Sequence, residues 1–483
     1  MKYVDTPQSS CWFGLRVADI TPPVGIYHRM WGAAAHDRAE GVHRPLRATA
    51  MAFRPWGENP GPDSQQVLVA LDHCLLGAAE VGALRDAVAA ATGLASDAIL
   101  VVFSHTHAAG LMSLDREALP GGELIRAYLQ RLHGTVAEQV GRALAAMQPS
   151  TISYAHGRCD LAAHRDLWDG DARQWVCGFN PDQPADDTLL VARVTGADDR
   201  LLATIVNYAC HPTTLGWQNR LISPDFPGAL REVVEQGTGA PCVFLQGASG
   251  DLGPRAGFVG EVDVADRNGR QLGHAALSTW LGLPPPRTRF VYTGPVVSGA
   301  TLGTWSHVPW PAERRQACAV WRRERGCVRL PYRCDLPKVQ DVEKEREELL
   351  AAERQARGAN DEAAAGQLRA LAERKTRLLS RLRSLPSGQD YPLEIVLWRM
   401  GDAVWVAVEG EPYHRLQKAL RARFPKTPTV IAALANGWGP SYLPPREVYG
   451  TGIYQESVAV LEAGSLERLT DELADRIERC LMK

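Results

Sequence analysis

Three histidines lie directly after apolar runs of the sequence, where their imidazoles could bind a metal. His105 and His107 are two residues apart in VVFSHTHAAG, and in an extended chain this spacing directs both rings to the same side. His211 follows the long apolar run LLATIVNYAC and precedes Pro212. Each motif alone is also typical of structural histidines that are hydrogen-bonded at strand ends. Their repeated placement favours one shared site for a divalent metal.

A carboxylate supplies a third candidate ligand. The run AVWVAVEGEPY contains Glu411, and the preceding Gly410 permits a close approach of the backbone. Zinc held by neutral imidazoles and a carboxylate keeps a position for water, lowers the pKa of that water and polarises a carbonyl. These residue types therefore suit hydrolysis of an amide. By composition alone, Glu411 could equally be an acid at the N-terminus of the following helix, stabilised by the helix dipole.

The elements that must position these residues follow an alternating α/β pattern. Short β-rich runs predict strands at 67–72, 99–104, 201–210 and 242–247, and small aliphatic residues predict a crossover helix at 78–92. Each strand ends in a polar cluster, and ligands of α/β sheets bind beyond the carboxyl ends of strands. The predicted fold class is α/β, with layered mixed β-sheets flanked by helices.

The composition changes to Glu, Arg, Ala, Leu and Gln from residue 338 onwards. This pattern predicts a charged helical hairpin at 338–385, inserted into a single composite catalytic domain formed by 1–337 and 386–483. A solvated excursion is one interpretation of the hairpin, and a contact between subunits of a homo-oligomer or a lid over the active site are the others. After the hairpin, the sequence predicts a β-hairpin and two further helices.

Composition excludes several classes of function. The chain of 483 residues has 53 basic and 55 acidic side chains and a net charge of −2, which does not indicate binding of nucleic acid or of an anionic membrane. No segment is long and apolar enough to be a transmembrane helix, and the N-terminus does not resemble a secretory signal. The 10 cysteines are scattered without CxxC pairs, which favours a reducing, cytoplasmic location.

The order of several motifs along the chain resembles the neutral/alkaline (non-lysosomal) ceramidase family, over the N-terminal catalytic domain only. The matching stretches are GLRVADITPP, GVHRPLRATAMAF, the strand ending in Asp72, FSHTHAAG, AHRDLW with GFNP, NYACHPTTLG, GASGDLGP, VEGEP and NGWGPSYLPPREVYGTGIYQE. Their joint order makes this resemblance more specific than any single motif.

The resemblance implies a set of site residues. One Zn²⁺ would be bound by His105, His211, Glu411 and Tyr442, although the match to Tyr442 requires one extra residue in the segment that begins at Asn436. This ligand set is an expectation carried over from the family.

The resemblance also implies three catalytic residues on the substrate side, namely His107, Arg165 and Tyr454. His107 could transfer a proton or hold the scissile carbonyl, while Arg165 and Tyr454 could stabilise the oxyanion. A structural histidine, a salt-bridging arginine and a packed aromatic are the alternative interpretations of these three residues.

One departure from the family pattern concerns the substrate. The GDxSPN motif reads Gly250-Asp251-Leu252-Gly253-Pro254-Arg255, so that the serine is replaced by Gly253. The prediction is therefore a zinc-dependent hydrolase of an amide (N-acyl) bond in a soluble, intracellular, small-molecule substrate other than ceramide. A zinc esterase or lactonase, and a non-catalytic binding or assembly protein with the same fold, are the alternatives.

Overall fold

A large mixed β-sheet runs through the computed structural model, which describes residues 2–57 and 64–482. In spatial order its strands are β14 (Cys242–Gln246), β12 (Leu201–Tyr208), β11 (Thr188–Gly196), β7 (Gln148–Arg158), β2 (Gln8–Asp19), β4 (Arg47–Pro55), β5 (Gln66–Leu71) and β6 (Ile99–Phe103). The pairs β5–β6 and β12–β14 are parallel and the other neighbours are antiparallel. The sheet is therefore mixed, as predicted.

A second sheet packs against one face of the first. Its strands, in order, are β18 (Trp321–Pro331), β19 (Asp390–Met400), β20 (Ala403–Val408) and β22 (Thr429–Ala432). Apolar side chains of both sheets meet in one core cluster, in which the ring of Phe53 lies 5.7 Å from that of Trp398 and 5.8 Å from that of Trp405. Alternate residues of each strand face this shared core, and the others face helices.

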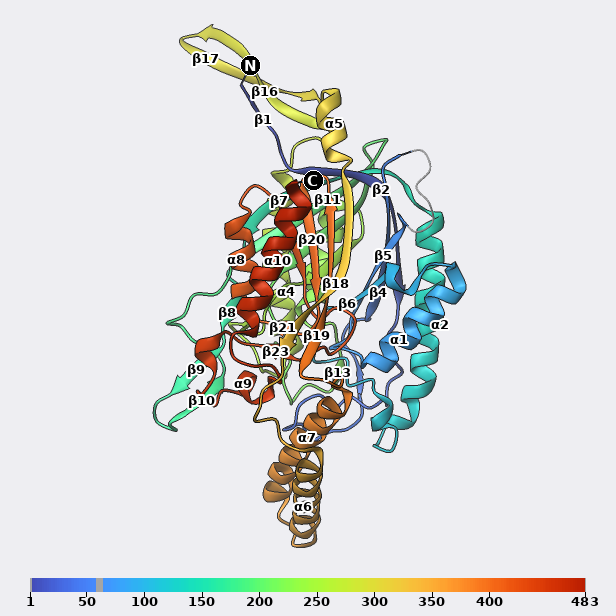
Figure 1. The fold of residues 1–483 in the computed structure, drawn as a ribbon, viewed down its shortest axis with the longest axis vertical. Helices are drawn as coiled ribbons and strands as arrows, with labels where there is room; N and C mark the ends of the chain where they lie inside the picture. Colours follow the sequence, from blue (N-terminus) through green and yellow to red (C-terminus); the bar gives the residue numbers. More distant parts are fainter. Residues whose placement is uncertain (1, 58–63, 483) are drawn as a thin grey trace.

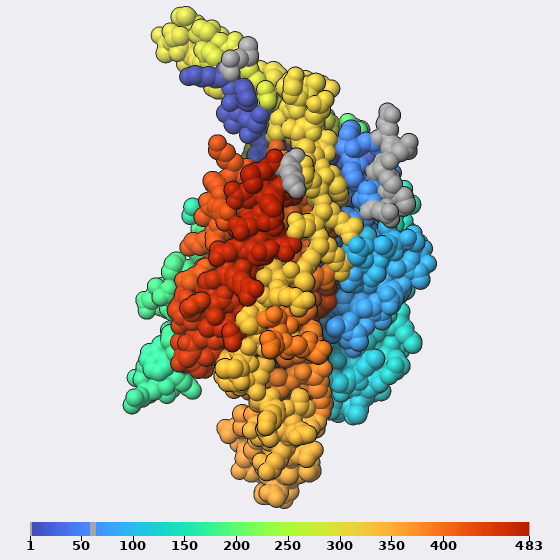
Figure 2. Space-filling view, viewed as in Figure 1, coloured from blue at the N-terminus to red at the C-terminus, as the bar shows by residue number. Residues whose placement is uncertain are grey.

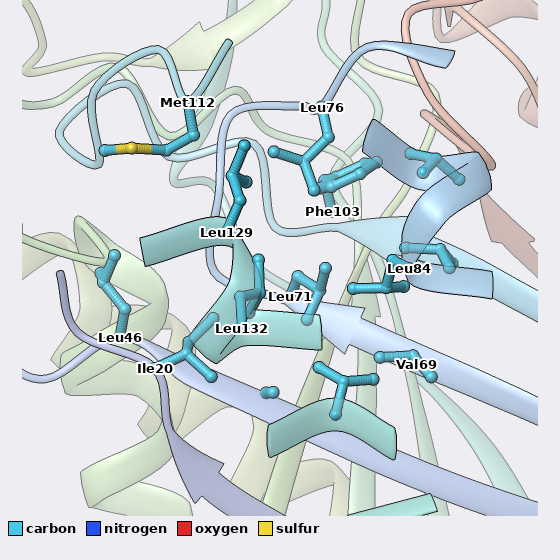
Figure 3. Close-up of a cluster of buried hydrophobic side chains, with 14 of the residues drawn as sticks. Ile20, Leu46, Val69, Leu71, Leu76, Leu84, Phe103, Met112, Leu129 and Leu132 are labelled. Carbon is cyan, nitrogen blue, oxygen red and sulfur yellow. The ribbon is translucent and has the colours of Figure 1, made fainter. Parts of the chain in front are cut away.

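Helices cover the outer face of each sheet and complete four layers (Figure 1). They are α1 (Ala78–Thr92), α2 (Ile125–Ala145), α3 (Phe226–Thr238) and α4 (Val262–Leu281) on the large sheet, with α8 (Arg415–Arg423) and α10 (Ser465–Met482) on the second sheet. Figure 3 shows the core beneath α1 and α2, where Leu84 and Leu132 face Val69 and Phe103.

Shorter elements lie around these layers. They are β3 (Gly41–Val42), β8 (Ala162–His164), β9 (Asp166–Asp169), β10 (Gln174–Cys177), β13 (Leu221–Ile222), β15 (Leu252–Pro254), β21 (Glu411–Pro412), β23 (Tyr442–Leu443), α5 (Ala312–Cys318), α9 (Tyr454–Val458) and the 3-10 turns Ser96–Ala98, Leu114–Arg116, Gly122–Leu124 and Arg446–Val448. Several of these short elements carry the functional residues.

Two segments project from opposite ends of the layered body (Figures 1 and 2). An arm at the top contains β1 (Tyr3–Val4), β16 (Thr288–Ser298) and β17 (Ala300–Pro309), and the hairpin of α6 (Val339–Gly358) and α7 (Glu362–Ser384) forms the lower end. The sequence predicted the helical hairpin but not the arm.

The predicted strands, the crossover helix 78–92 and the helical hairpin are all confirmed within one or two residues at most ends. The interpretation of the hairpin as a purely solvated excursion is wrong for α7, because Ala372, Leu379 and Arg381 are buried and other residues of this helix line a cavity. In the described part of the chain, no helix has the length and apolar character needed to cross a membrane.

Candidate metal centre and active site

His105 lies just beyond the carboxyl end of β6, in a backbone conformation that side chains rarely adopt. Its φ is +70°, and such strain in a non-glycine residue is typical of functional sites. The backbone N–H of His105 donates to the His73 carbonyl at 2.9 Å, and ring Nδ1 donates to the Cys74 carbonyl at 2.7 Å. Because Nδ1 is used in that bond, Nε2 is the ring nitrogen that could act as a ligand.

His211 follows β12 and is held in the same manner. Its backbone N–H donates to the Leu252 carbonyl at 3.1 Å, and Nδ1 donates to the Ser249 carbonyl at 2.7 Å. The two Nε2 atoms of His105 and His211 are then 3.1 Å apart. Both imidazoles therefore direct their Nε2 atoms to the same point.

Glu411 brings a carboxylate to this point from the second sheet. One carboxylate oxygen, Oε2, lies 3.0 Å from Nε2 of His211 and 3.3 Å from Nε2 of His105. The chain reaches this position through Gly410, whose φ is +77° and where an added Cβ would lie 2.6 Å from the Ser441 carbonyl oxygen. Two imidazole nitrogens and a carboxylate oxygen at such distances form a donor set that suits zinc.

Tyr442 joins the same centre through a short parallel strand pair. Glu411 in β21 is opposite Tyr442 in β23, and the N–H of Glu411 donates to the Ser441 carbonyl at 2.8 Å. The Tyr442 hydroxyl oxygen lies 3.4 Å from Nε2 of His211. The structure thus brings together all four residues that the resemblance implied as ligands.

Arg165 lies beside the Tyr442 hydroxyl. Arg165 follows β8, and its backbone N–H donates to the Asp251 carbonyl at 2.9 Å. Nη2 of Arg165 donates to the Tyr442 hydroxyl at 3.0 Å and to the Gly250 carbonyl at 2.7 Å. Its Nε–H is buried without a hydrogen-bond partner, so that one donor remains for a ligand.

His107 and Tyr454 lie nearer to the cavity than to the ligand centre. Nε2 of His107 is 3.4 Å from Nε2 of His105, and its ring packs on that of Trp31 at 5.0 Å between centroids. The Tyr454 ring is 5.9 Å from that of Tyr442 and is 42% exposed. His107 is therefore in reach of a substrate at the centre, whereas Tyr454 lies at the cavity rim.

The electrostatics of the centre couple His105 to Glu411. Burial alone would lower the pKa of His105, but the neighbouring Cys74 and Glu411 outweigh it and raise that pKa well above its usual value. Burial lowers the pKa of His211 to about 3, and Arg165 adds to this effect. Burial and the neighbouring imidazoles hold the pKa of His107 well below its usual range. Burial alone would raise the pKa of Glu411, but His105 and His211 outweigh it and hold that pKa well below its ordinary value. At neutral pH, Glu411 is thus a carboxylate and both His107 and His211 are neutral.

The other polar clusters at strand ends have different partners. Asp72 forms a buried ion pair with Arg231, with oxygen–nitrogen distances of 2.9 and 2.6 Å. Asp251 pairs with His414 at 2.5 Å and His164 at 3.4 Å, and these three residues line a separate cavity. Of the four clusters that the sequence placed at strand ends, only those containing His105 and His211 form the candidate metal centre.

Gly253 leaves space where the family pattern has a serine. A Cβ added at this glycine would lie 3.5 Å from Oγ1 of Thr213 and 3.8 Å from Cδ of Arg165, which are ordinary contact distances. Ser249 lies in the turn that follows β14, where its hydroxyl accepts a hydrogen bond from Nε2 of Gln246 at 2.5 Å. The serine of the family motif is therefore replaced by a residue without a hydroxyl.

A cavity of about 420 Å³ opens above the centre, a volume that suits a small-molecule ligand. Its lining residues come from the layered body and from α7. The residues from the body are Met30, Trp31, Gly32, His107, Arg165, Cys177, Thr213, Phe258, Tyr442 and Tyr454. The residues from α7 are Ala370, Glu373, Arg374 and Arg377. The sequence did not single out the residues of α7, Trp31 or Phe258. The one signal available was the spacing of the arginines along α7.

The search of protein-family models and the search of curated proteins each found no match to the chain. Among solved structures, the neutral ceramidase from Pseudomonas aeruginosa superimposes with a TM-score of 0.65 at 18% sequence identity, over 99% of this chain and 75% of that one. A second structure, a ceramidase complexed with C2, gives a TM-score of 0.64 at 19% identity, over 98% of this chain and 76% of that one. The comparison confirms the prediction made from the motifs: this chain has a neutral ceramidase-like fold.

Proposed function

We propose that this protein is a zinc-dependent hydrolase that cleaves an amide (N-acyl) bond of a small molecule. The observation that carries the proposal is the convergence of His105 Nε2, His211 Nε2 and Glu411 Oε2 within 3.3 Å of one another. These atoms lie beside the Tyr442 hydroxyl at the base of the cavity. The ceramidase-like fold supports the same reaction class, since ceramide is an N-acyl compound.

Zinc held by His105, His211, Glu411 and Tyr442 would supply a Lewis acid and lower the pKa of water at the base of the cavity. The second nitrogen of each histidine is fixed by a backbone carbonyl, which is the usual support for a metal-ligating imidazole. The donor set of this chain therefore fits the metal.

The protein's own groups surround the position of a scissile carbonyl. Arg165 carries a permanent positive charge and an unpartnered Nε–H, so that it can stabilise negative charge developing on the carbonyl oxygen. His107 is neutral and lies at the cavity wall, where its imidazole can accept a proton from water and return it to the leaving amine. Tyr454 at the rim would contact the substrate further from the reacting atoms.

An intracellular, soluble amide other than ceramide is the substrate class proposed here. All ten cysteines are free, and seven of them are buried, which supports a reducing, cytoplasmic location. The place of the family serine is taken by Gly253, which supports a substrate different from ceramide.

Metal content and turnover test the proposal together. Purified protein should contain about one zinc per chain, as expected for one four-ligand centre, and a His105→Ala/His211→Ala variant should lose it. A Tyr442→Phe variant should retain zinc more weakly than the wild type. His274→Ala, which changes an exposed histidine of α4, is the matched control and should keep full zinc content.

A panel of N-acyl amides and the matched esters then defines the reaction. We expect amide turnover in the zinc-loaded wild type and in His274→Ala, and none in the double variant. Full zinc retention by the double variant would remove the metal assignment. A zinc-loaded wild type that hydrolyses only esters, or nothing in the panel, would contradict the amidase proposal.

A further inference from the structure

Three arginines of α7 share one face of the helix, and two of them line the cavity. Arg374, Arg377 and Arg381 are spaced by three and four residues, the spacing that places side chains on one side of an α-helix. Ala370, one turn earlier on the same face, lines the cavity with Arg374 and Arg377. The hairpin therefore presents Arg374 and Arg377 to the space above the proposed metal centre, and Arg381 lies one turn further along the same face.

Arg381 is buried without a salt-bridge partner. It is only 7% exposed, its Nε–H has no hydrogen-bond partner, and its guanidinium lies over the Trp438 ring at 5.6 Å. Within residues 2–57 and 64–482 its side chain forms no hydrogen bond or ion pair with another residue. Buried cations are normally paired, so an unpaired one beside an active-site cavity indicates that the partner is a ligand.

Arg374 and Arg377 differ in how much of their donor capacity is used. Arg374 donates to the Ser457 hydroxyl at 2.8 Å and has no carboxylate partner in the described part of the chain. Arg377 donates to Glu373 at 2.9 Å and also to the Met30 carbonyl. Arg374 therefore has free N–H donors near the cavity rim, while Arg377 is mainly a structural contact of the hairpin.

The charges around the cavity do not balance. Among the lining residues, the cationic groups are Arg165, Arg374 and Arg377, and the anionic group is Glu373. Glu373 is already paired with Arg116 at 2.8 Å and with Arg377 at 2.9 Å, and Glu411 is assigned to the metal. Binding of a divalent cation by Glu411 would increase the positive excess.

We propose that the arginine face of α7, chiefly Arg381 with Arg374, binds an oxyanion on the substrate, which makes the enzyme selective for anionic N-acyl compounds. This substrate class rests on the proposed amidase function. A carboxylate and a phosphate monoester share the required chemistry, because both accept paired N–H bonds from a guanidinium group. The hairpin is therefore a specificity element of the active site.

Matched substrates that differ in charge test the selectivity. N-hexanoylglycine carries a carboxylate on its amine part, N-propyl adipamic acid carries one on its acyl part, and N-propyl hexanamide has none. In Arg381→Met, kcat/KM for the preferred anionic substrate should fall about 10- to 100-fold, the usual effect of losing a charge-assisted hydrogen bond. The neutral amide should change by less than about threefold, and Arg374→Gln should give a smaller loss of the same selectivity.

Stability separates a binding role of Arg381 from a structural one. Replacement of an unpaired buried cation by an apolar side chain of similar length should leave the melting temperature unchanged or raise it. If Arg381→Met melts well below the wild type, Arg381 has a structural role and the proposal is wrong. Arg383→Gln is the control, since Arg383 is on the same helix, is 52% exposed and pairs with Glu343 of α6.

Direct binding gives a readout that does not depend on turnover. Calorimetric titration of the zinc-loaded protein with hexanoate, hexyl phosphate and hexanol should show that one or both anions bind more tightly than the alcohol. Arg381→Met, but not Arg383→Gln, should remove this preference, and the ratio of the two anions identifies the oxyanion. If the wild type and Arg381→Met bind the anions equally well, the proposal is wrong. If the anions bind through Arg381 but no amide is hydrolysed, only the proposed amidase function is contradicted.

Discussion

A buried carboxyl group next to the candidate metal centre makes the stability of this fold depend on pH in a direction that can be calculated. Glu409 lies two residues before Glu411, and its Oε2 accepts hydrogen bonds from the Tyr391 hydroxyl at 3.1 Å and the Glu394 N–H at 3.0 Å. Burial raises the pKa of Glu409 from 4.5 to about 7. The folded protein therefore binds this proton more tightly than the unfolded chain does.

The sign of the effect follows from that difference. The free energy of unfolding falls as pH rises from the unfolded pKa of 4.5 to the folded pKa of about 7, and no further loss occurs above it. Between pH 5 and pH 8, the two pKa values correspond to a loss of about 2.5 kcal/mol from this one group. Glu409→Gln has no proton to lose and keeps an acceptor oxygen, so it should escape this loss.

Urea denaturation at pH 5 and at pH 8 measures the effect. The stability of Glu409→Gln relative to the wild type should be about 2.5 kcal/mol more favourable at pH 8 than at pH 5. Glu348→Gln, an exposed position of α6, should show no such change with pH. A difference between Glu409→Gln and wild type that is the same at both pH values would refute the reasoning.

Two glycines near the centre give further predictions. Gly410→Ala should lower the free energy of unfolding by about 2 kcal/mol and reduce the zinc content, because φ is +77° and the new Cβ would lie 2.6 Å from the Ser441 carbonyl oxygen. The control Gly366→Ala, at an open helical position, should be neutral or stabilising. Unchanged stability and zinc content in Gly410→Ala would contradict the proposed constraint on the ligands. Gly253→Ser should retain a free energy of unfolding within about 0.5 kcal/mol of the wild type, since the new Cβ meets only ordinary contacts. A loss of more than about 2 kcal/mol in a denaturant titration would show that a serine side chain does not fit at this position.

The sequence was sufficient to predict most local elements and the first two metal-ligand candidates. Strong apolar runs located β5, β6, β12 and β14, and their polar ends identified His105 and His211. The prediction of Tyr442 and Arg165 came from the family resemblance, because neither lies in a pattern that periodicity could distinguish from ordinary packing. In the structure, the Tyr442 hydroxyl lies beside the His211 imidazole, and the Arg165 guanidinium lies beside the Tyr442 hydroxyl.

The role of α7 could not be predicted from the sequence, and the reason is physical. Arginines spaced at three and four residues form one face of a helix whether that face meets water or a cavity. Only the tertiary structure shows that Arg381 is buried, while Arg383, two residues later, is exposed. The packing of the two sheets could likewise not be predicted from the sequence, since the alternation of apolar and polar residues within a strand does not show which element covers each face.

Two asparagines explain how ligands from separate sheets arrive at one point. Asn207 of β12 accepts from the N–H of Ile431 in β22 at 3.0 Å and donates to the Ile431 carbonyl at 2.7 Å. Asn436 accepts from the N–H of Val101 in β6 at 3.0 Å, and its own N–H donates to the Val101 carbonyl at 2.8 Å. Each paired contact lies four residues before a histidine of the centre, so sliding of one sheet on the other would break buried hydrogen bonds before it separated the ligands. The register between the sheets, rather than any single loop, therefore sets the geometry of the proposed metal centre.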